Sequence, residues 1–265
     1  MVSRRGLHYA AGLSQPLAFI MTYAVGFYLE TGLVFAADTR TNAGVDDIST
    51  FRKLTAFETP GDRLLVLLTS GNLAVTQSVV ELLRQGAAAK KKGAVHLLNV
   101  GDMFAAARVV GDAVRAVYHR DHEALAEHNE DFRATLIFGG QIKGGPMRLF
   151  LIYAAGNFIE ASPDSPYVQI GENKYGKPII DRTITHRSTM MEAAKCCLLS
   201  FDSTMRSNIS VGLPIDLQCY RKDSHRRGFS TRIDEKTGYF QSVRAYWGDA
   251  LRFAFQEMPD PDWKI

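Results

Sequence analysis

A hydroxyl, a carboxylate and an amine occur close together near the start of the sequence, at Thr22, Asp38 and Lys53. A threonine hydroxyl is a weak nucleophile at neutral pH, and a free α-amine on the same residue is able to act as its base. A nearby lysine lowers the proton affinity of that amine, and an aspartate holds the lysine in place. These residue types therefore predict nucleophilic attack on a carbonyl carbon, provided that Thr22 is the first residue of the mature chain.

A predicted β-hairpin brings two of these side chains together. Residues 22–28 and 33–38 are rich in β-forming residues and flank a turn. A turn centred near Glu30 and Thr31 pairs residues whose numbers sum to about 60, which sets Thr22 opposite Asp38. The same pattern also fits a hairpin without catalysis, in which a β-branched residue begins one strand and an aspartate ends its partner.

Lys53 lies on the next predicted strand, residues 51–57, where it shares a face with Phe51 and Phe57. A lysine among aromatic side chains is rarely buried without an acidic partner. We therefore expect Lys53 to approach Asp38, so that the threonine, aspartate and lysine converge.

The elements that position these residues come in blocks of strands and helices. Strands are expected at 63–69, 135–138, 147–153, 167–171, 215–220 and 228–233, and helices at 72–89, 102–127, 188–204 and 245–257. The glycine cluster at 139–145 is predicted to be a hairpin turn, since strand-like runs flank it. This order differs from the strict alternation of a doubly wound fold and predicts an α+β fold, with antiparallel sheets stacked between helical layers.

Composition narrows the class of protein. The chain has 265 residues, which suits one compact domain, and its 31 basic and 28 acidic residues give a balanced surface that does not favour nucleic-acid binding. No run approaches the ~18 apolar residues that a membrane-spanning helix needs, so we expect no membrane partner. Three cysteines do not form a complete disulfide framework, which favours the cytoplasm.

Several common catalytic motifs are absent. The sequence contains no Gly-x-Ser-x-Gly elbow, phosphate-binding loop, His-Glu-x-x-His metal motif or dinucleotide-binding Gly-x-Gly-x-x-Gly. We expect neither a metal nor another cofactor.

Longer stretches of sequence resemble a known family. Residues 22–26, 32–40, Lys53 and 70–77 resemble the proteasome β-subunit pattern, and residues 39–53, 170–178 and 203–214 resemble, more narrowly, the bacterial Anbu (ancestral β-subunit) family. The resemblance covers residues 21–265. It implies an N-terminal nucleophile hydrolase fold, a four-layer αββα sandwich in which two antiparallel sheets lie between helical layers.

The resemblance also implies roles for individual residues. Thr22 is expected to be the nucleophile and its own base, Asp38 and Lys53 its electrostatic support, and the backbone N–H of Gly71 the oxyanion donor. Weaker candidates for the site are Arg40, Ser207 and Ser210. The two serines lie where related subunits carry a Ser/Asp cluster, but no aspartate stands at the usual place.

The implied activity is that of a threonine peptidase that cuts peptides or unfolded proteins. The implied partner is the chain itself, in a ring or an open helical dodecamer. Family members begin with Met-Thr, as at Met21 and Thr22, so residues 22–265 form the expected peptidase domain. We expect residues 1–21 to reflect a misassigned start. The alternatives are a propeptide removed by self-cleavage and an extension that is retained, which leaves Thr22 without a free amine.

Two other functions remain open. The same nucleophile serves narrow-specificity amidohydrolases, because a fold does not fix a substrate. A catalytically idle scaffold or peptide-binding subunit is the third possibility, although idle subunits usually lose the threonine or the lysine. The joint presence of Thr22, Asp38, Lys53 and Gly71 argues against this third function.

Overall fold

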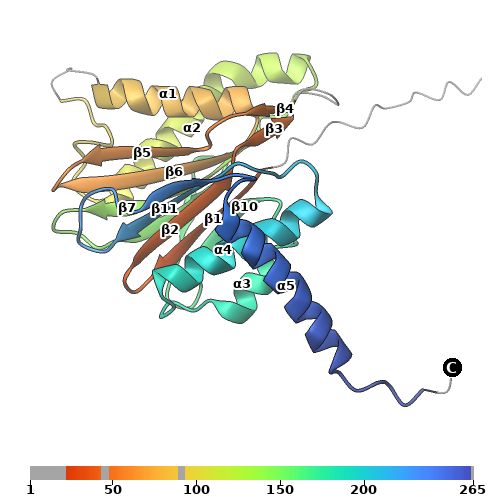
Figure 1. The fold of residues 1–265 in the computed structure, drawn as a ribbon. Coiled ribbons are helices and arrows are strands. Elements are labelled where there is room, and N and C mark those ends of the chain that lie inside the picture. The colour runs from red at the N-terminus through yellow and green to blue at the C-terminus, as the bar shows by residue number, and fades with distance from the viewer. Residues whose placement is uncertain (1–21, 43–47, 89–92, 264–265) are drawn as a thin grey trace, which may run out of the picture.

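The computed structural model describes residues 22–42, 48–88 and 93–263, so the expectation for residues 1–21 lies outside the described residues. In these ranges the chain forms two five-stranded antiparallel sheets, one two-stranded sheet and five helices (Figure 1). The expected α+β class is confirmed. The two large sheets are consistent with a sandwich.

The first large sheet contains the first two described strands at interior positions, with a neighbouring strand on each side. Its strand order is β10-β1-β2-β11-β12, with β1 (Tyr23–Leu29), β2 (Gly32–Asp38), β10 (Tyr167–Gly171), β11 (Ile215–Arg221) and β12 (Ser230–Ile233). Every residue of β2 is buried. A strand covered on both faces has a nearly continuous apolar sequence, which explains the run from Gly32 to Ala37.

The second large sheet follows sequence order. It consists of β5 (Leu54–Thr59), β6 (Arg63–Gly71), β7 (Ala134–Ile142), β8 (Arg148–Ile152) and β9 (Phe158–Glu160). The small sheet pairs β3 (Arg40–Asn42) with β4 (Ile48–Thr50). Strands β5 and β12 are therefore edge strands of the two large sheets.

The helices are α1 (Leu73–Ala88), α2 (Met103–Glu127), α3 (Lys177–Thr183), α4 (Met190–Ser207) and α5 (Gly238–Gln256). Side chains fix several of their first turns. Asp102 accepts from the Ala105 N–H at 2.8 Å, and Thr189 and Glu192 form a capping box at the start of α4.

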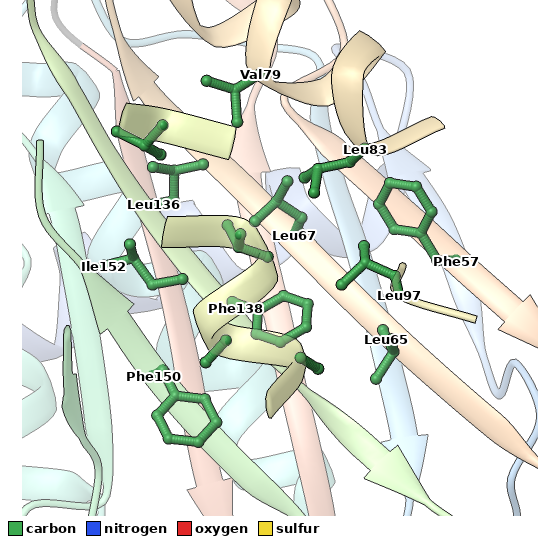
Figure 2. Packing of buried hydrophobic residues seen from close by; sticks show 14 of the residues in the cluster. Phe57, Leu65, Leu67, Val79, Leu83, Leu97, Leu136, Phe138, Phe150 and Ile152 are labelled. Atoms are coloured by element: carbon green, nitrogen blue, oxygen red, sulfur yellow. The ribbon is translucent and has the colours of Figure 1, made fainter. Parts of the chain in front are cut away.

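Three clusters of buried apolar side chains hold these elements together. One joins the second sheet to α1 and α2, and Figure 2 shows its contacts around Leu67, Phe138 and Phe150. Another joins the first sheet to α3, α4 and the start of α5, and the third draws on the inner faces of both sheets, as with Phe35 and Ile137. Each sheet thus contributes alternate side chains to two clusters.

The first hairpin forms as predicted, but its expected register is wrong by one residue. The turn contains only Glu30 and Thr31, so paired residues sum to 61, as in Ala24 with Ala37. This register sets Asp38 beside Tyr23 rather than opposite Thr22. A turn centred between Glu30 and Thr31 gives a sum of 61, so the approximate sum of 60 placed each partner one residue away.

Other differences concern short elements and boundaries. Strand β5 begins at Leu54, so Lys53 lies just before the strand and not within it. Helix α3 and strand β9 were not expected from the sequence, because seven and three residues are too short for a clear periodic pattern. Helix α5 begins at Gly238, seven residues before its expected start. A hairpin does form around residues 139–145, but residues 139–142 belong to β7 and its turn begins only at Lys143.

Candidate active site

A buried ion pair joins the end of β2 to the segment before β5. The Nζ atom of Lys53 donates to Asp38 Oδ1 at 2.9 Å and to the backbone oxygen of Arg40 at 2.6 Å. The same Asp38 oxygen accepts the Tyr23 N–H at 3.2 Å. The carboxylate therefore bonds both to Lys53 and to the backbone directly after Thr22.

Backbone hydrogen bonds hold the lysine in this position. The Phe51 N–H donates to the Thr39 oxygen at 2.8 Å, and the Thr69 N–H donates to the Lys53 oxygen at 3.1 Å. The segment before β5 is thus bonded to the residue that follows β2 and to β6, which places the Lys53 side chain within reach of Asp38.

Burial dominates the electrostatics of this pair. It raises the pKa of Asp38 from 3.8 to about 6, although the charge of Lys53 and its hydrogen bond oppose that rise. Burial also lowers the pKa of Lys53, against the pull of Asp38. Both changes have the same cause, since removal from water disfavours the charged form of each group.

The backbone of Thr22 is anchored by the end of β10. Its oxygen accepts the Glu172 N–H at 2.7 Å. Gly171 packs so closely here that a Cβ atom added to it would lie 1.7 Å from the Thr22 oxygen and 3.3 Å from Ser70 Oγ. The contact therefore requires glycine, and the Ser70 side chain, near the end of β6, lies beside it.

Gly71 lies where β6 meets the first turn of α1. Its φ angle is +121°, and a Cβ atom would lie 2.2 Å from the Arg133 oxygen. Asn72 caps the helix, since its Oδ1 atom accepts from the Ala74 N–H at 3.0 Å. The partial positive charge of a helix N-terminus thus lies next to the residue expected to donate to an oxyanion.

A second buried carboxylate lies beside Thr22 and was missed by the sequence reasoning. Glu172 is buried, and its Oε2 atom accepts from Asn208 Nδ2 at 3.1 Å. Asn208 Oδ1 in turn accepts the Ser210 N–H at 2.9 Å. Glu172 belongs to the segment 170–178 on which the family resemblance was based, and that segment was the available signal.

The three weaker candidates fall at different places. Arg40 contributes its backbone oxygen to Lys53, while its side chain packs against Gly212. Ser210 connects to Thr22 through Asn208 and Glu172. Ser207 is an exposed residue at the end of α4, and within the described ranges no hydrogen bond joins its side chain to another site residue.

A pocket of about 390 Å³ lies near Lys53. Two of its lining residues make the connection: the Thr69 N–H donates to the Lys53 oxygen, and Phe51 lies two residues before Lys53 in the sequence. Its wall combines apolar and polar side chains: Phe51, Arg52, Thr55, Thr69, Leu73, Thr76, Gln77, Val80, Glu81 and Arg84. Such a wall suits one side chain of an extended substrate.

Neither a metal site nor a membrane-spanning helix is found among the described residues. No group of three or more His, Cys, Asp or Glu side chains in these ranges is arranged to hold a metal ion. Among the helices that the structure describes, none is both long enough and apolar enough to cross a membrane.

Comparison with known proteins gives three informative structural neighbours. The Anbu (Gly-1) mutant from Hyphomicrobium sp. strain MC1 is 50% identical, with 91% of this chain and 100% of that chain covered and a TM-score of 0.86. Anbu (ancestral beta-subunit) from Yersinia bercovieri is 48% identical, with coverages of 91% and 100% and a TM-score of 0.85.

The third neighbour is described as the helical assembly of the Anbu complex from Pseudomonas aeruginosa. It is 48% identical over 90% of this chain and 98% of that chain, with a TM-score of 0.85. No protein-family model and no curated protein matches the chain.

Proposed function

The chain belongs to the Anbu (ancestral β-subunit) family of bacterial proteasome-type proteins, and from this premise we propose that it is a threonine peptidase whose nucleophile is Thr22. The observation that carries the proposal is the buried pair of Lys53 and Asp38, bonded to the backbone next to Thr22. A buried charge pair has a high desolvation cost, so its position beside a candidate nucleophile favours a chemical role.

The proposed reaction begins when residues 1–21 are absent and the α-amine of Thr22 is free. The amine accepts the proton of the Thr22 hydroxyl, whose oxygen attacks the peptide carbonyl carbon. The positive charge of Lys53 keeps the amine in its neutral, basic form near pH 7, and Asp38 holds Lys53 in place. The backbone N–H of Gly71, at the N-terminal end of α1, stabilises the oxyanion.

Collapse of that intermediate breaks the C–N bond. The amine of Thr22 returns the proton to the leaving nitrogen, and the acyl group remains as an ester on the Thr22 oxygen. Water then attacks the ester, gives its proton to the amine and releases the carboxylic acid, which restores the hydroxyl. We propose that the pocket beside Phe51 and Leu73 holds the substrate side chain before the cleaved bond.

The proposal includes the fold and the assembly typical of the family. The three apolar clusters support a four-layer αββα arrangement of the N-terminal nucleophile hydrolase type. The helical assembly of the Pseudomonas aeruginosa relative supports self-association of this chain. The proposed substrates are peptides or unfolded proteins. Free thiols at Cys196, Cys197 and Cys219 support a cytoplasmic location.

The test compares three versions of the protein on a library of fluorogenic peptides. The first begins at Thr22, as verified by intact mass and N-terminal sequencing, the second retains residues 1–21, and the third carries Thr22→Ala. We expect turnover only from the first, with a loss of at least about 10³-fold in the others, because each lacks either the base or the nucleophile.

Two outcomes would overturn the proposal. Equal turnover by Thr22→Ala would place the chemistry elsewhere. No turnover of peptides by a verified free Thr22 would reject the peptidase, and a parallel screen of non-peptide amides would then separate a narrow amidohydrolase from a catalytically idle scaffold.

A further inference from the structure

A cationic groove runs between the edge strands of the two large sheets. It has a volume of about 430 Å³ and lies against β5 and β12. Its walls carry four arginines together with hydroxyl and amide groups: Arg52, Leu54, Thr55, Ala56, Phe57, Arg84, Asp216, Gln218, Arg227, Ser230, Thr231 and Arg232. Hydrogen-bond donors therefore outnumber acceptors along the groove.

Only two of the four arginines have acidic partners in the described residues. Arg232 Nε donates to Asp216 Oδ1 at 2.8 Å, and Arg227 Nε lies 3.8 Å from Glu58 Oε2. No hydrogen bond or ion pair joins Arg52 or Arg84 to any residue that the structure describes. These two guanidinium groups leave the groove with an excess of positive charge.

A buried amide gives an independent indication of a ligand. Gln218 lines the groove, its side chain is 1% exposed, and its Nε2 atom has no hydrogen-bond partner among the described residues. A buried donor without an acceptor costs free energy. A ligand that brings an oxygen acceptor to this position would remove that cost.

The groove continues into the pocket near Lys53. Arg52, Thr55 and Arg84 line both hollows. A ligand in the groove would therefore lie next to the proposed substrate pocket.

The complementary segment is the tail of the same chain, residues 257–263. It carries Glu257, Asp260 and Asp262 followed by Trp263, whose ring is exposed. Pro259 and Pro261 fix two φ angles and remove two N–H donors, so the tail is extended, rich in acceptors and partly ordered before it binds.

Helix α5 presents this tail away from the body of its own subunit (Figure 1). Phe240 is the one residue of α5 that is buried, whereas Tyr246, Leu251, Phe253 and Phe255 are exposed. Exposed aromatic and aliphatic side chains on one arm are typical of a surface that a protein partner covers.

We propose that the groove between β5 and β12 binds the acidic tail, residues 257–263, of a second copy of this chain. Asp260 and Asp262 pair with Arg52 and Arg84, and a tail oxygen accepts from Gln218 Nε2. Because the contact joins two different surfaces, each copy has a free tail and a free groove, and repetition builds a ring or an open helix. This inference rests on the proposed self-association and names the contact that produces it.

The test is a charge swap in the full chain, followed by sedimentation velocity. The groove variant carries Arg52→Glu and Arg84→Glu, and the tail variant carries Asp260→Arg and Asp262→Arg. Matched controls reverse exposed charges elsewhere, with Arg108→Glu and Arg187→Glu for the groove and Glu127→Arg and Asp164→Arg for the tail. Circular dichroism verifies that every variant is folded.

We expect each swap variant to self-associate at least about tenfold more weakly than wild type, while both controls associate normally. An equimolar mixture of the two variants should assemble with the two copies in alternation, because each acidic tail then meets an arginine groove and each arginine tail meets a glutamate groove. The protein with all four substitutions should regain the wild-type assembly.

Two results would overturn the inference. Swap variants that assemble like their controls would show that the tail and groove do not meet. Weak assembly of both variants without any complex in the mixture would show that the two surfaces act separately or within one chain. If the wild-type chain stays monomeric, the proposed self-association itself is wrong. The sedimentation of wild type alone shows this, so the result is distinguishable from a failure of the tail–groove contact.

Discussion

The ammonium nitrogen of Lys53 lies 2.9 Å from the Oδ1 atom of Asp38, and the side chains are only 5% and 0% exposed. Lys53 stands outside any strand, and Asp38 is the last residue of β2. The pair therefore fixes a loop to a sheet at the point where β1 begins. Such an arrangement couples the stability of the fold to the geometry around Thr22.

Loss of Lys53 alone should lower the free energy of unfolding more than loss of both the Lys53 and Asp38 charges. Lys53→Met leaves Asp38 buried without its partner, and we expect the free energy of unfolding to fall by about 3–5 kcal/mol. The double variant Lys53→Met with Asp38→Asn should lie within about 2 kcal/mol of wild type, since no unpaired charge remains. Urea denaturation measures both, and equal losses would contradict the coupling.

The raised pKa of Asp38 gives stability a defined dependence on pH. Since the folded state binds this proton more tightly than an ordinary aspartate, the contribution of Asp38 to stability is greatest below pH ~4 and falls as the pH rises through about 6. Relative to Asp38→Asn, wild type should lose about 3 kcal/mol between pH 4 and 7. If the stability of wild type relative to Asp38→Asn instead increases with pH, the ion pair with Lys53 affects the pKa of Asp38 more than burial does.

A methyl group at Gly71 should disrupt the region around Thr22. The φ angle of +121° and the contact with the Arg133 oxygen both oppose a side chain, so Gly71→Ala should cost at least about 2 kcal/mol. Gly61→Ala is the matched control, because Gly61 also has a positive φ but has open space around it; there we expect about 1 kcal/mol. Thermal denaturation compares the two, and equal costs would contradict the close packing at Gly71.

Glu172 should act as an acceptor that positions its neighbours. Glu172→Gln keeps an oxygen for Asn208 Nδ2, whereas Glu172→Ala leaves that donor without a partner. We expect Glu172→Ala to cost about 1–3 kcal/mol of stability and to reduce kcat by about tenfold, and Glu172→Gln to restore most of both. If the glutamine variant is as inactive as the alanine variant, the negative charge of Glu172 is itself required.

Local patterns in the sequence were sufficient for much of the fold. The first hairpin, the helices α1 and α2 and the pair β11 and β12 were predicted because each has its own periodicity and turn residues. The register of the hairpin was wrong by one residue because the sequence locates the centre of a turn only approximately, whereas the pairing depends on its exact position. Helix α3 was missed because it is short.

The candidate site was harder to predict, because long-range pairing assembles it. Asp38 and Lys53 were predicted to meet, and the structure brings them together. The position of Glu172 depends on β10 pairing with β1, a contact between residues about 150 positions apart in sequence, and no local pattern indicates it. Ser207 was a candidate because of its position in the sequence, but it is exposed at the end of α4. Its neighbour Asn208, and not Ser207, bonds to Glu172.

The pairing of β1 with β10 and of β2 with β11 has a consequence for how the protein is made. Tyr23 pairs with Gly171, and Asp38 pairs with Ile215, so both walls beside Thr22 come from the last 100 residues of the chain. A nascent polypeptide emerges from the ribosome with its N-terminus first. Thr22 and Asp38 therefore leave the ribosome early, but β11, the last of their neighbouring strands, follows only at residues 215–221, so the proposed site is assembled late in synthesis.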